Sequence, residues 1–166
     1  SRLKLFRAEH SVIRTCLYWV EMFDIPTFVS THLVRHNIGI SHFVSSHRPD
    51  RSEYTDPTQV NRLTPVDHAM LINAQGLINM ARKRLCYKAS PETREVMQAI
   101  KDAMFDVDPD LYKCLVPECY YRKKCPELQS CKMYERNVAR PLITIMFDHE
   151  IPEDYKRHTL EDYLKS

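Results

Sequence analysis

The first hydrophobic pattern in the chain is a run of β-branched and aromatic residues at about positions 14–23, which is typical of a strand. Within that strand, Tyr18 and Trp19 are expected in the core of a sheet. Pro26 then begins a helix expected over about residues 26–36, because proline is favoured at the first helical position. The apolar side of this helix is expected to carry Phe28, Val29, Leu33 and Val34.

Two strong helix-start signals follow. Thr64-Pro65 with Asp67 supplies a hydroxyl cap, an N-terminal proline and an acid in the first turn. The helix that it starts is expected to run to about Tyr87, because apolar residues keep helical spacing at Met70, Ala74, Leu77, Ala81 and Leu85. Ser90-Pro91-Glu92 repeats the signal and predicts a second helix to about Phe105.

The remaining segments are shorter or more polar. Residues 49–63 are rich in turn-forming residues and are expected to form a mobile loop. Asp108-Pro109 indicates a short helix, residues 114–131 a cysteine-rich loop, and residues 152–164 a terminal helix. These segments place one predicted strand among several predicted helices.

The composition narrows the class of protein. The 166 residues fit one domain over residues 1–166, and 43% hydrophobic with 28% charged residues is ordinary for a soluble globular chain. A net charge of +2 is too small to indicate non-specific nucleic-acid binding. The sequence contains no apolar run of membrane-spanning length and no signal-peptide pattern at its first residues. Six cysteines without an export signal then predict reduced thiols in the cytoplasm.

The sequence contains only two glycines, Gly39 and Gly76. Walker loops and dinucleotide-binding G-x-G-x-x-G loops need several closely spaced glycines, so both are excluded. Any phosphate must therefore be bound by side chains and helix ends.

Residues 32–48 concentrate two arginines, four histidines and three serines among apolar residues. This composition predicts an ordered strip with an apolar side held by the fold and a cationic side facing an anion. Arginine and serine donors suit phosphate. The alternative is a solvated basic loop.

The helix predicted over residues 65–87 carries a second polar set. Asn73 and Arg84 are eleven residues apart, about three turns, and are expected on nearly the same face. Asn79 lies on a flank and Gln75 near the N-terminal end. Buried amides would need partners, whereas the alternative is that these side chains are exposed to solvent.

Together these two segments resemble the flavin-dependent thymidylate synthase family, in particular its short phage-type members. The family signature R-H-R-x-x-S, followed by S-x-R-Y, is matched by Arg35, His36, Ser41, Ser46 and Arg48 if one residue is inserted after His36. The helical motif is matched, without gaps, by residues 73–79, Arg84, Ala89 and Glu92. The phage-type members also have segments similar to Arg84-Leu85-Cys86, Val116-Pro117-Glu118-Cys119 and Cys125-Pro126-Glu127.

The resemblance covers about residues 26–131 and implies a mixed α/β homotetramer that binds FAD and dUMP where subunits meet. It implies transfer of a one-carbon unit from methylenetetrahydrofolate to C5 of dUMP, with the hydride supplied by FAD that NADPH has reduced. The cofactor would carry the chemistry while the protein supplies position and charge.

The resemblance also implies roles for single residues. Those implied to face the flavin are Arg35, His36, Asn37, Asn73 and Asn79. Those implied to bind the nucleotide are Arg35, Ser46 and Arg48, the last two at the phosphate. Arg84 is implied to lie against the uracil, where a fixed positive charge would favour the N3-ionised pyrimidine.

The chain departs from the family pattern at several of these contacts. Asn37 stands where the family has arginine, Gln75 replaces the arginine of the helical motif, and Pro49 replaces a tyrosine. Phe43 and Val44 fill the positions of an Asn-Glu pair. Each lost charge-assisted contact could weaken binding by about 1.5–3 kcal/mol. The alternatives are therefore a divergent homologue acting on another pyrimidine nucleotide, or a non-catalytic protein that binds nucleotide or nucleic acid.

Four cysteines fall close together in the expected loop, at positions 114, 119, 125 and 131. They could hold a tetrahedral zinc ion, although no two-residue gap typical of zinc knuckles is present, so reduced thiols are the alternative. A zinc ribbon gripping nucleic acid is a rival hypothesis, weakly supported by Tyr120-Tyr121-Arg122. Glu9-His10 could approach the flavin or lie at the surface, and His149-Glu150 is expected at the surface.

Overall fold

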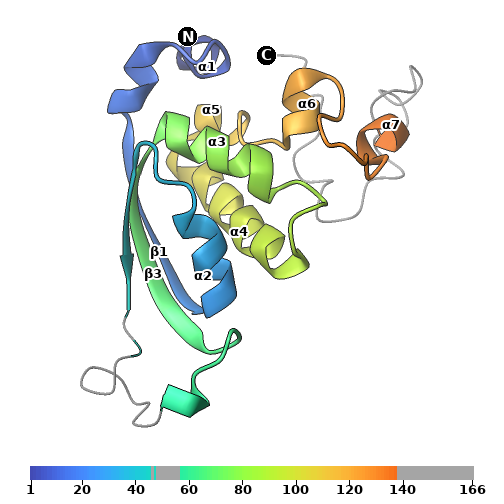
Figure 1. Ribbon diagram of the computed structural model, residues 1–166. Coiled ribbons are helices and arrows are strands. Elements are labelled where there is room, and N and C mark those ends of the chain that lie inside the picture. Colours follow the sequence, from blue (N-terminus) through green and yellow to red (C-terminus); the bar gives the residue numbers. More distant parts are fainter. Residues whose placement is uncertain (46, 48–56, 138–166) are drawn as a thin grey trace. The chain divides into compact units, whose positions relative to one another are not determined.

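The computed structural model describes residues 1–45, 47 and 57–137. The fold is mixed α+β, with one three-stranded antiparallel sheet and several helices (Figure 1). Contacts divide the chain into two compact units, one formed by residues 9–80 and the other by residues 1–8 with the chain from residue 81 onward. Helix α3 (Ala74–Arg84) begins in the first unit and ends in the second.

The sheet lies in the unit of residues 9–80. Its strands are β1 (Leu17–Pro26), β2 (Ile40–Val44) and β3 (Pro65–Asn73), in the order β1-β3-β2. Both neighbours run antiparallel to β3, so β3 is hydrogen-bonded on its two sides. The register of β1 shifts between Met22 and Ile25, where Asp24 takes a positive φ of 53°. Two short 3-10 helices, Ser11–Thr15 and Pro57–Gln59, lie in the connections.

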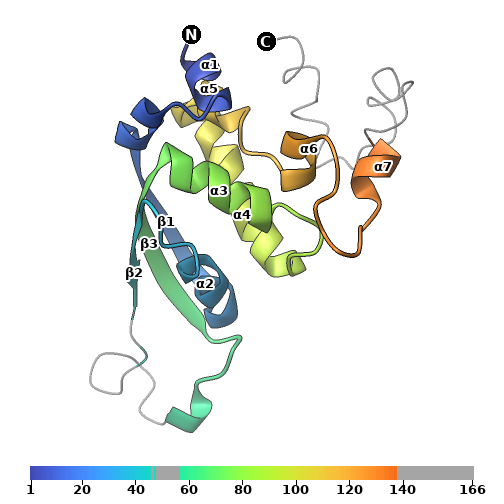
Figure 2. The same cartoon turned by 45° about the horizontal axis from the view of Figure 1, so that its top comes forward.

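One face of the sheet is covered by helix α2 (Thr27–Val34), as the two views show (Figures 1 and 2). Val29 and Leu33 of α2 are fully buried. Every second residue of β3 contributes to the same core, namely Val66, His68, Met70 and Ile72. This period of two is the signature of a strand with one covered face.

The opposite face of the sheet is open and carries several large apolar side chains, beside Glu21, which accepts the Trp19 indole N–H at 2.9 Å. Trp19 and Phe43 are 54% and 53% exposed, and Leu17 and Leu71 also lie on this face. The rings of Trp19 and Phe43 approach to 5.5 Å between centroids. We call these four side chains the open sheet face.

The second unit is helical. It contains α1 (Arg2–Arg7), α4 (Pro91–Val107), α5 (Pro109–Tyr112), α6 (Glu118–Arg122) and α7 (Met133–Asn137). Its buried apolar residues include Phe6, Met97, Met104, Leu111 and Leu115.

Several sequence predictions are confirmed. The helix predicted from Pro91 is α4, and the Ser90 hydroxyl accepts the Thr93 N–H as its cap. The short helix predicted after Asp108 is α5, where the Asp108 carboxylate accepts the Leu111 N–H at 3.2 Å. The helix predicted at 26–36 is α2, and the first strand is β1, placed three residues later than expected.

Two predictions about residues 14–87 are wrong. The first half of the helix predicted over residues 65–87 is strand β3, and only Ala74–Arg84 is helical. In this segment the alternation of buried residues prevails over the helix-start signal, because the segment pairs with two neighbouring strands. Trp19 is not in the sheet core, because it points to the uncovered face. The predicted cysteine-rich loop contains the short helix α6.

Some predictions fall on other parts of the chain. Residues 49–56, the terminal helix at 152–164, and His149-Glu150 lie outside the described residues. The described segment 57–63 makes ordered contacts, including an Asn61 side chain that accepts the Leu63 N–H. Among the helices that the structure describes, none has the length and apolar character needed to cross a bilayer.

Candidate functional site

The two segments that resemble the family signature meet at the junction of β3 and α3. The Asn73 backbone N–H donates to the carbonyl oxygen of Gly39 at 2.9 Å. The Asn73 side-chain oxygen accepts the Gly76 N–H at 2.8 Å, so Asn73 caps the N-terminus of α3. One residue therefore connects the 35–39 loop, β3 and α3.

The only two glycines of the sequence lie at this contact. Gly39 has a φ of +75°, and an added Cβ would lie 2.4 Å from the Asn73 side-chain nitrogen. A Cβ on Gly76 would lie 3.1 Å from the Ile38 carbonyl oxygen. Both positions therefore need glycine for close approach of loop and helix.

The 35–39 loop presents its polar residues outward. Arg35 follows α2, and Arg35 and Asn37 are exposed. His36 is half-buried, and its backbone N–H donates to the Leu33 carbonyl oxygen at 2.9 Å. Ile38 is 81% exposed, which is unusual for a large apolar side chain between two ordered elements. The loop thus offers a cation, an amide and an apolar side chain to a partner on one side of the junction.

A chain of hydrogen bonds leads from helix α2 through the sheet to the 35–39 loop and fixes the position of the loop. Ser30 Oγ lies 3.0 Å from His68 Nδ1, and His68 Nε2 lies 2.9 Å from His42 Nδ1. His42 Nε2 lies 2.6 Å from the His36 carbonyl oxygen. We call Ser30, His68, His42 and the His36 carbonyl the histidine chain.

When both imidazoles are neutral, the hydrogen-bond partners allow one set of proton positions in the histidine chain. The His36 carbonyl can only accept, so His42 donates from Nε2 and its neutral Nδ1 accepts. His68 then donates from Nε2, and its Nδ1 accepts the Ser30 hydroxyl proton.

His68 is 1% exposed, and the cost of burying a charge lowers its pKa from 6.5 to about 4, with a smaller contribution from His42. His68 therefore stays neutral at physiological pH. Its position suits a fixed support for the loop rather than a group that exchanges protons near neutrality.

A second polar group lies on α3. Gln75 Nε2 donates to the Glu9 carboxylate at 2.6 Å and to the Asn79 side-chain oxygen at 3.3 Å. Glu9 is therefore in contact with the helical motif, whereas His10 is exposed and caps the first 3-10 helix. The contact was left open by the sequence because residues 9 and 75 are far apart in the chain.

The other residues implied by the resemblance have separate positions. Asn73 is the last residue of β3, so the prediction that Asn73 and Arg84 share one helix face is wrong. Arg84 is the last residue of α3, about 15 Å along the helix from Ala74 by its rise per residue. Ser46 and Arg48, implied to bind phosphate, lie outside the described residues.

The four cysteines singled out from the sequence do not stay together. Cys119, Cys125 and Cys131 line one cavity, and their neighbour in that cavity is Cys86. Cys114 is buried elsewhere, near Arg7, Asp108 and Asp110, and burial raises its pKa to about 12. Spacing alone favoured Cys114, because Cys86 is 33 positions before Cys119 and follows α3.

Sequence reasoning also missed Ser30 and His68. The available signal was the period-two alternation of Val66, His68, Met70 and Ile72, which places the histidine on the covered face of a strand. A search of protein-family models and a search of curated protein sequences each found no match to the chain.

Proposed function

We propose that this chain is a flavin-dependent thymidylate synthase-like enzyme. It transfers a one-carbon unit from methylenetetrahydrofolate to C5 of dUMP, with FAD as cofactor and NADPH as reductant. It works as a homotetramer, with the nucleotide and the flavin bound where subunits meet.

The observation that carries this proposal is the contact between the 35–39 loop and the start of α3. The resemblance treats these segments as two separate motifs, and Gly39 and Asn73, which meet at this contact, are 34 residues apart in the chain. The structure supports a joint role, because Gly39, Asn73 and Gly76 pack the two segments against each other. A ligand bound at this junction would contact both motifs.

Arg35 of the 35–39 loop is suited to the phosphates of a flavin nucleotide, and the amides are suited to its polar ring edge. Arg35 provides a charged fork of donors, and Asn37 and Asn79 provide exposed amides. The start of α3 carries the positive end of the helix dipole. FAD, when bound, supplies the hydride transfer, and the chain's own residues bind and orient it.

Arg84 has a different role in the proposal. A fixed guanidinium against the uracil stabilises negative charge on the ring and so raises electron density at C5. Ser46 and Arg48 bind the phosphate of dUMP by the same resemblance.

The open sheet face supports assembly. Four large apolar side chains on one sheet face are a surface that copies of the chain would bury on association. This contact would also shield Trp19 and Phe43 from water.

One observation favours the second candidate, action on a different pyrimidine nucleotide. Gln75 replaces a cationic residue of the family motif, and its amide is bound by Glu9. An acidic side chain at that point disfavours a phosphate and leaves room for a substrate with different polar groups.

The decisive experiment is an anaerobic titration of the FAD-loaded protein with NADPH, with and without dUMP, followed by flavin absorbance. We expect flavin reduction to accelerate with dUMP, and dTMP to form when methylenetetrahydrofolate is added. Failure to bind FAD would refute the proposal. Binding of FAD without any response to dUMP would favour the second candidate, and other pyrimidine nucleotides would then replace dUMP.

Two substitutions sharpen the assignment. Arg84→Ala should abolish turnover and leave the assembly unchanged by size-exclusion chromatography, and Arg35→Ala should weaken FAD binding. Arg14→Ala is the matched control, because Arg14 is an exposed arginine in the first 3-10 helix. Turnover by Arg84→Ala equal to that of Arg14→Ala would remove the role assigned to Arg84.

A further inference from the structure

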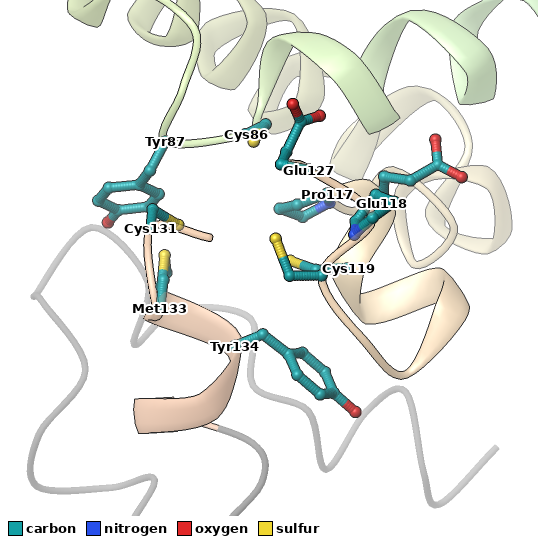
Figure 3. Close-up of a pocket in the computed structure, with 11 residues that line it drawn as sticks. Cys86, Tyr87, Pro117, Glu118, Cys119, Glu127, Cys131, Met133 and Tyr134 are labelled. Atoms are coloured by element: carbon teal, nitrogen blue, oxygen red, sulfur yellow. The ribbon is translucent and has the colours of Figure 1, made fainter. Parts of the chain in front are cut away.

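Four cysteines from separate parts of the sequence surround one narrow cavity. Cys86 follows α3, Cys119 lies in α6, Cys125 follows α6, and Cys131 precedes α7. Figure 3 shows Cys86, Cys119 and Cys131 around the same space, each on a different segment. All four cysteines belong to the helical unit.

The walls of this cavity are mainly apolar, and they include Pro117, Met133 and Tyr134. The cavity volume is about 10 Å³, close to the space that one water-sized sphere requires. It therefore suits one ion. All four cysteines are free thiols.

The sulfur atoms are close enough to influence one another. Burial raises the pKa of Cys119 to about 12, with smaller contributions from the other three thiols of the cavity, because neighbouring thiolates repel. Cys125 and Cys131 likewise raise the pKa of Cys86, after the larger effect of burial.

We propose that Cys86, Cys119, Cys125 and Cys131 bind one Zn²⁺ ion in a structural site. Four thiolates are the ligand set of closed, tetrahedral zinc sites. Within the residues that the structure describes, no three His, Cys, Asp or Glu side chains are already placed to hold a metal ion, so the proposal requires the thiols to rotate into the cavity.

The proton balance of this step is complete. Zn²⁺ displaces one proton from each of the four thiols, which gives a tetrathiolate complex with a net charge of two minus and releases four protons. The same segment carries Lys123, Lys124 and Lys132. Two carboxylates, Glu118 and Glu127, also line the cavity, and Glu118 is paired with Arg122 at 2.6 Å. All four coordination positions are filled by protein, so the ion has no open position for catalysis.

The site has a structural purpose. The apolar cluster at α6 and α7 is small, and it consists of Cys119, Tyr120 and Tyr134 with Val116 and Cys125 packed against it. Such a cluster has little apolar surface to hold two helices of five residues each. A zinc ion that joins the end of α3 to α6 and α7 would add the missing stabilisation.

The test measures metal in the full chain, purified under reducing conditions and without an affinity metal. We expect about one zinc per chain by mass spectrometry. Added Co²⁺ should give the absorption of a tetrahedral tetrathiolate complex, and Zn²⁺ should then displace it.

Substitutions identify the ligands. Cys119→Ser should weaken Zn²⁺ binding by more than the roughly 10–100-fold effect typical of residues outside the ligand shell. Cys114→Ser is the matched control, because Cys114 is equally buried and its pKa is also raised to about 12, but it lies outside the cavity. Cys125→His should retain the metal, since zinc also accepts three cysteines and one histidine, whereas Cys125→Ala should lose it.

The outcomes separate the alternatives. Absence of Zn²⁺ and Co²⁺ binding by the reduced wild-type chain would overturn the proposal, whether or not the variants fold. Equal loss of metal in Cys114→Ser and Cys119→Ser would overturn the ligand assignment. Iron with inorganic sulfide, or disulfides among these cysteines in the freshly purified chain, would replace zinc with a different chemistry. None of these results depends on flavin or nucleotide binding.

Discussion

Buried His68 makes the sheet unit sensitive to acid. The folded chain keeps the pKa of His68 at about 4, while the unfolded chain has the ordinary value of 6.5. Below pH 6.5 the unfolded state therefore binds the proton that the folded state excludes, and the free energy of unfolding falls as the pH falls toward 4. The lowered pKa of His68 corresponds to a total of about 3 kcal/mol in the free energy of unfolding. About 2.5 kcal/mol of this total is lost when the pH falls to about 4.5. Above pH 6.5 this contribution is constant.

The assay is urea unfolding at about pH 7.5 and at about pH 4.5, followed by the fluorescence of Trp19. Trp19 is the only tryptophan of the chain and lies in the same unit as His68, so its signal reports on that unit. We compare the wild type with His68→Gln, which keeps a neutral amide but does not titrate. The variant should be less stable at neutral pH and should lose about 2.5 kcal/mol less on acidification.

The exposed His10 offers a control, because His10→Gln leaves His68 and the histidine chain in place. It should keep the acid sensitivity of the wild type. Equal acid sensitivity in His68→Gln and the wild type would refute the argument that the buried neutral imidazole is the cause.

Three further predictions concern other parts of the chain. Gly39→Ala should lower the free energy of unfolding by about 2 kcal/mol or more, from the positive φ and the displaced Asn73 cap; an unchanged urea midpoint would contradict this. Burial lowers the pKa of Lys101 to about 8, so the unfolded state binds more protons between pH 8 and 10.5 and stability should rise with pH there, by about 2 kcal/mol up to about pH 10. Unfolding of Lys101→Met, followed by circular dichroism, should show no such rise in the free energy of unfolding. A rise that persists in this variant would point to another group. Trp19→Ser should reduce the oligomer mass measured by light scattering, whereas an intact tetramer would show that assembly does not need the open sheet face.

Local signals in the sequence predicted the helix caps well. Ser90 and Asp108 cap α4 and α5, because a short polar side chain before a proline satisfies the first backbone donors of a helix with residues only three positions away. The first strand and α2 were predicted for the same reason, since their patterns are complete within about ten residues.

Strand β3 was the main error, and its cause is not local. Residues 65–73 contain a helix-start signal and good helix formers, and they become a strand because β1 and β2 both pair with them. The same pairing brings His68 next to His42 and so creates the histidine chain. The period-two alternation of residues 66–72 is a strand signal within the segment, but no pattern within one segment shows which strands will pair.

The sequence by itself determined which residue types are present for chemistry: the cationic strip, the helical amides, the reduced cysteines, and two glycines in place of a phosphate-binding loop. Tertiary structure decided which of them meet. Gly39 and Gly76 pack at one junction, and Cys86 replaces Cys114 beside Cys119. Spacing predicts neighbours only along a continuous element, whereas contacts between elements depend on how their buried faces pack together.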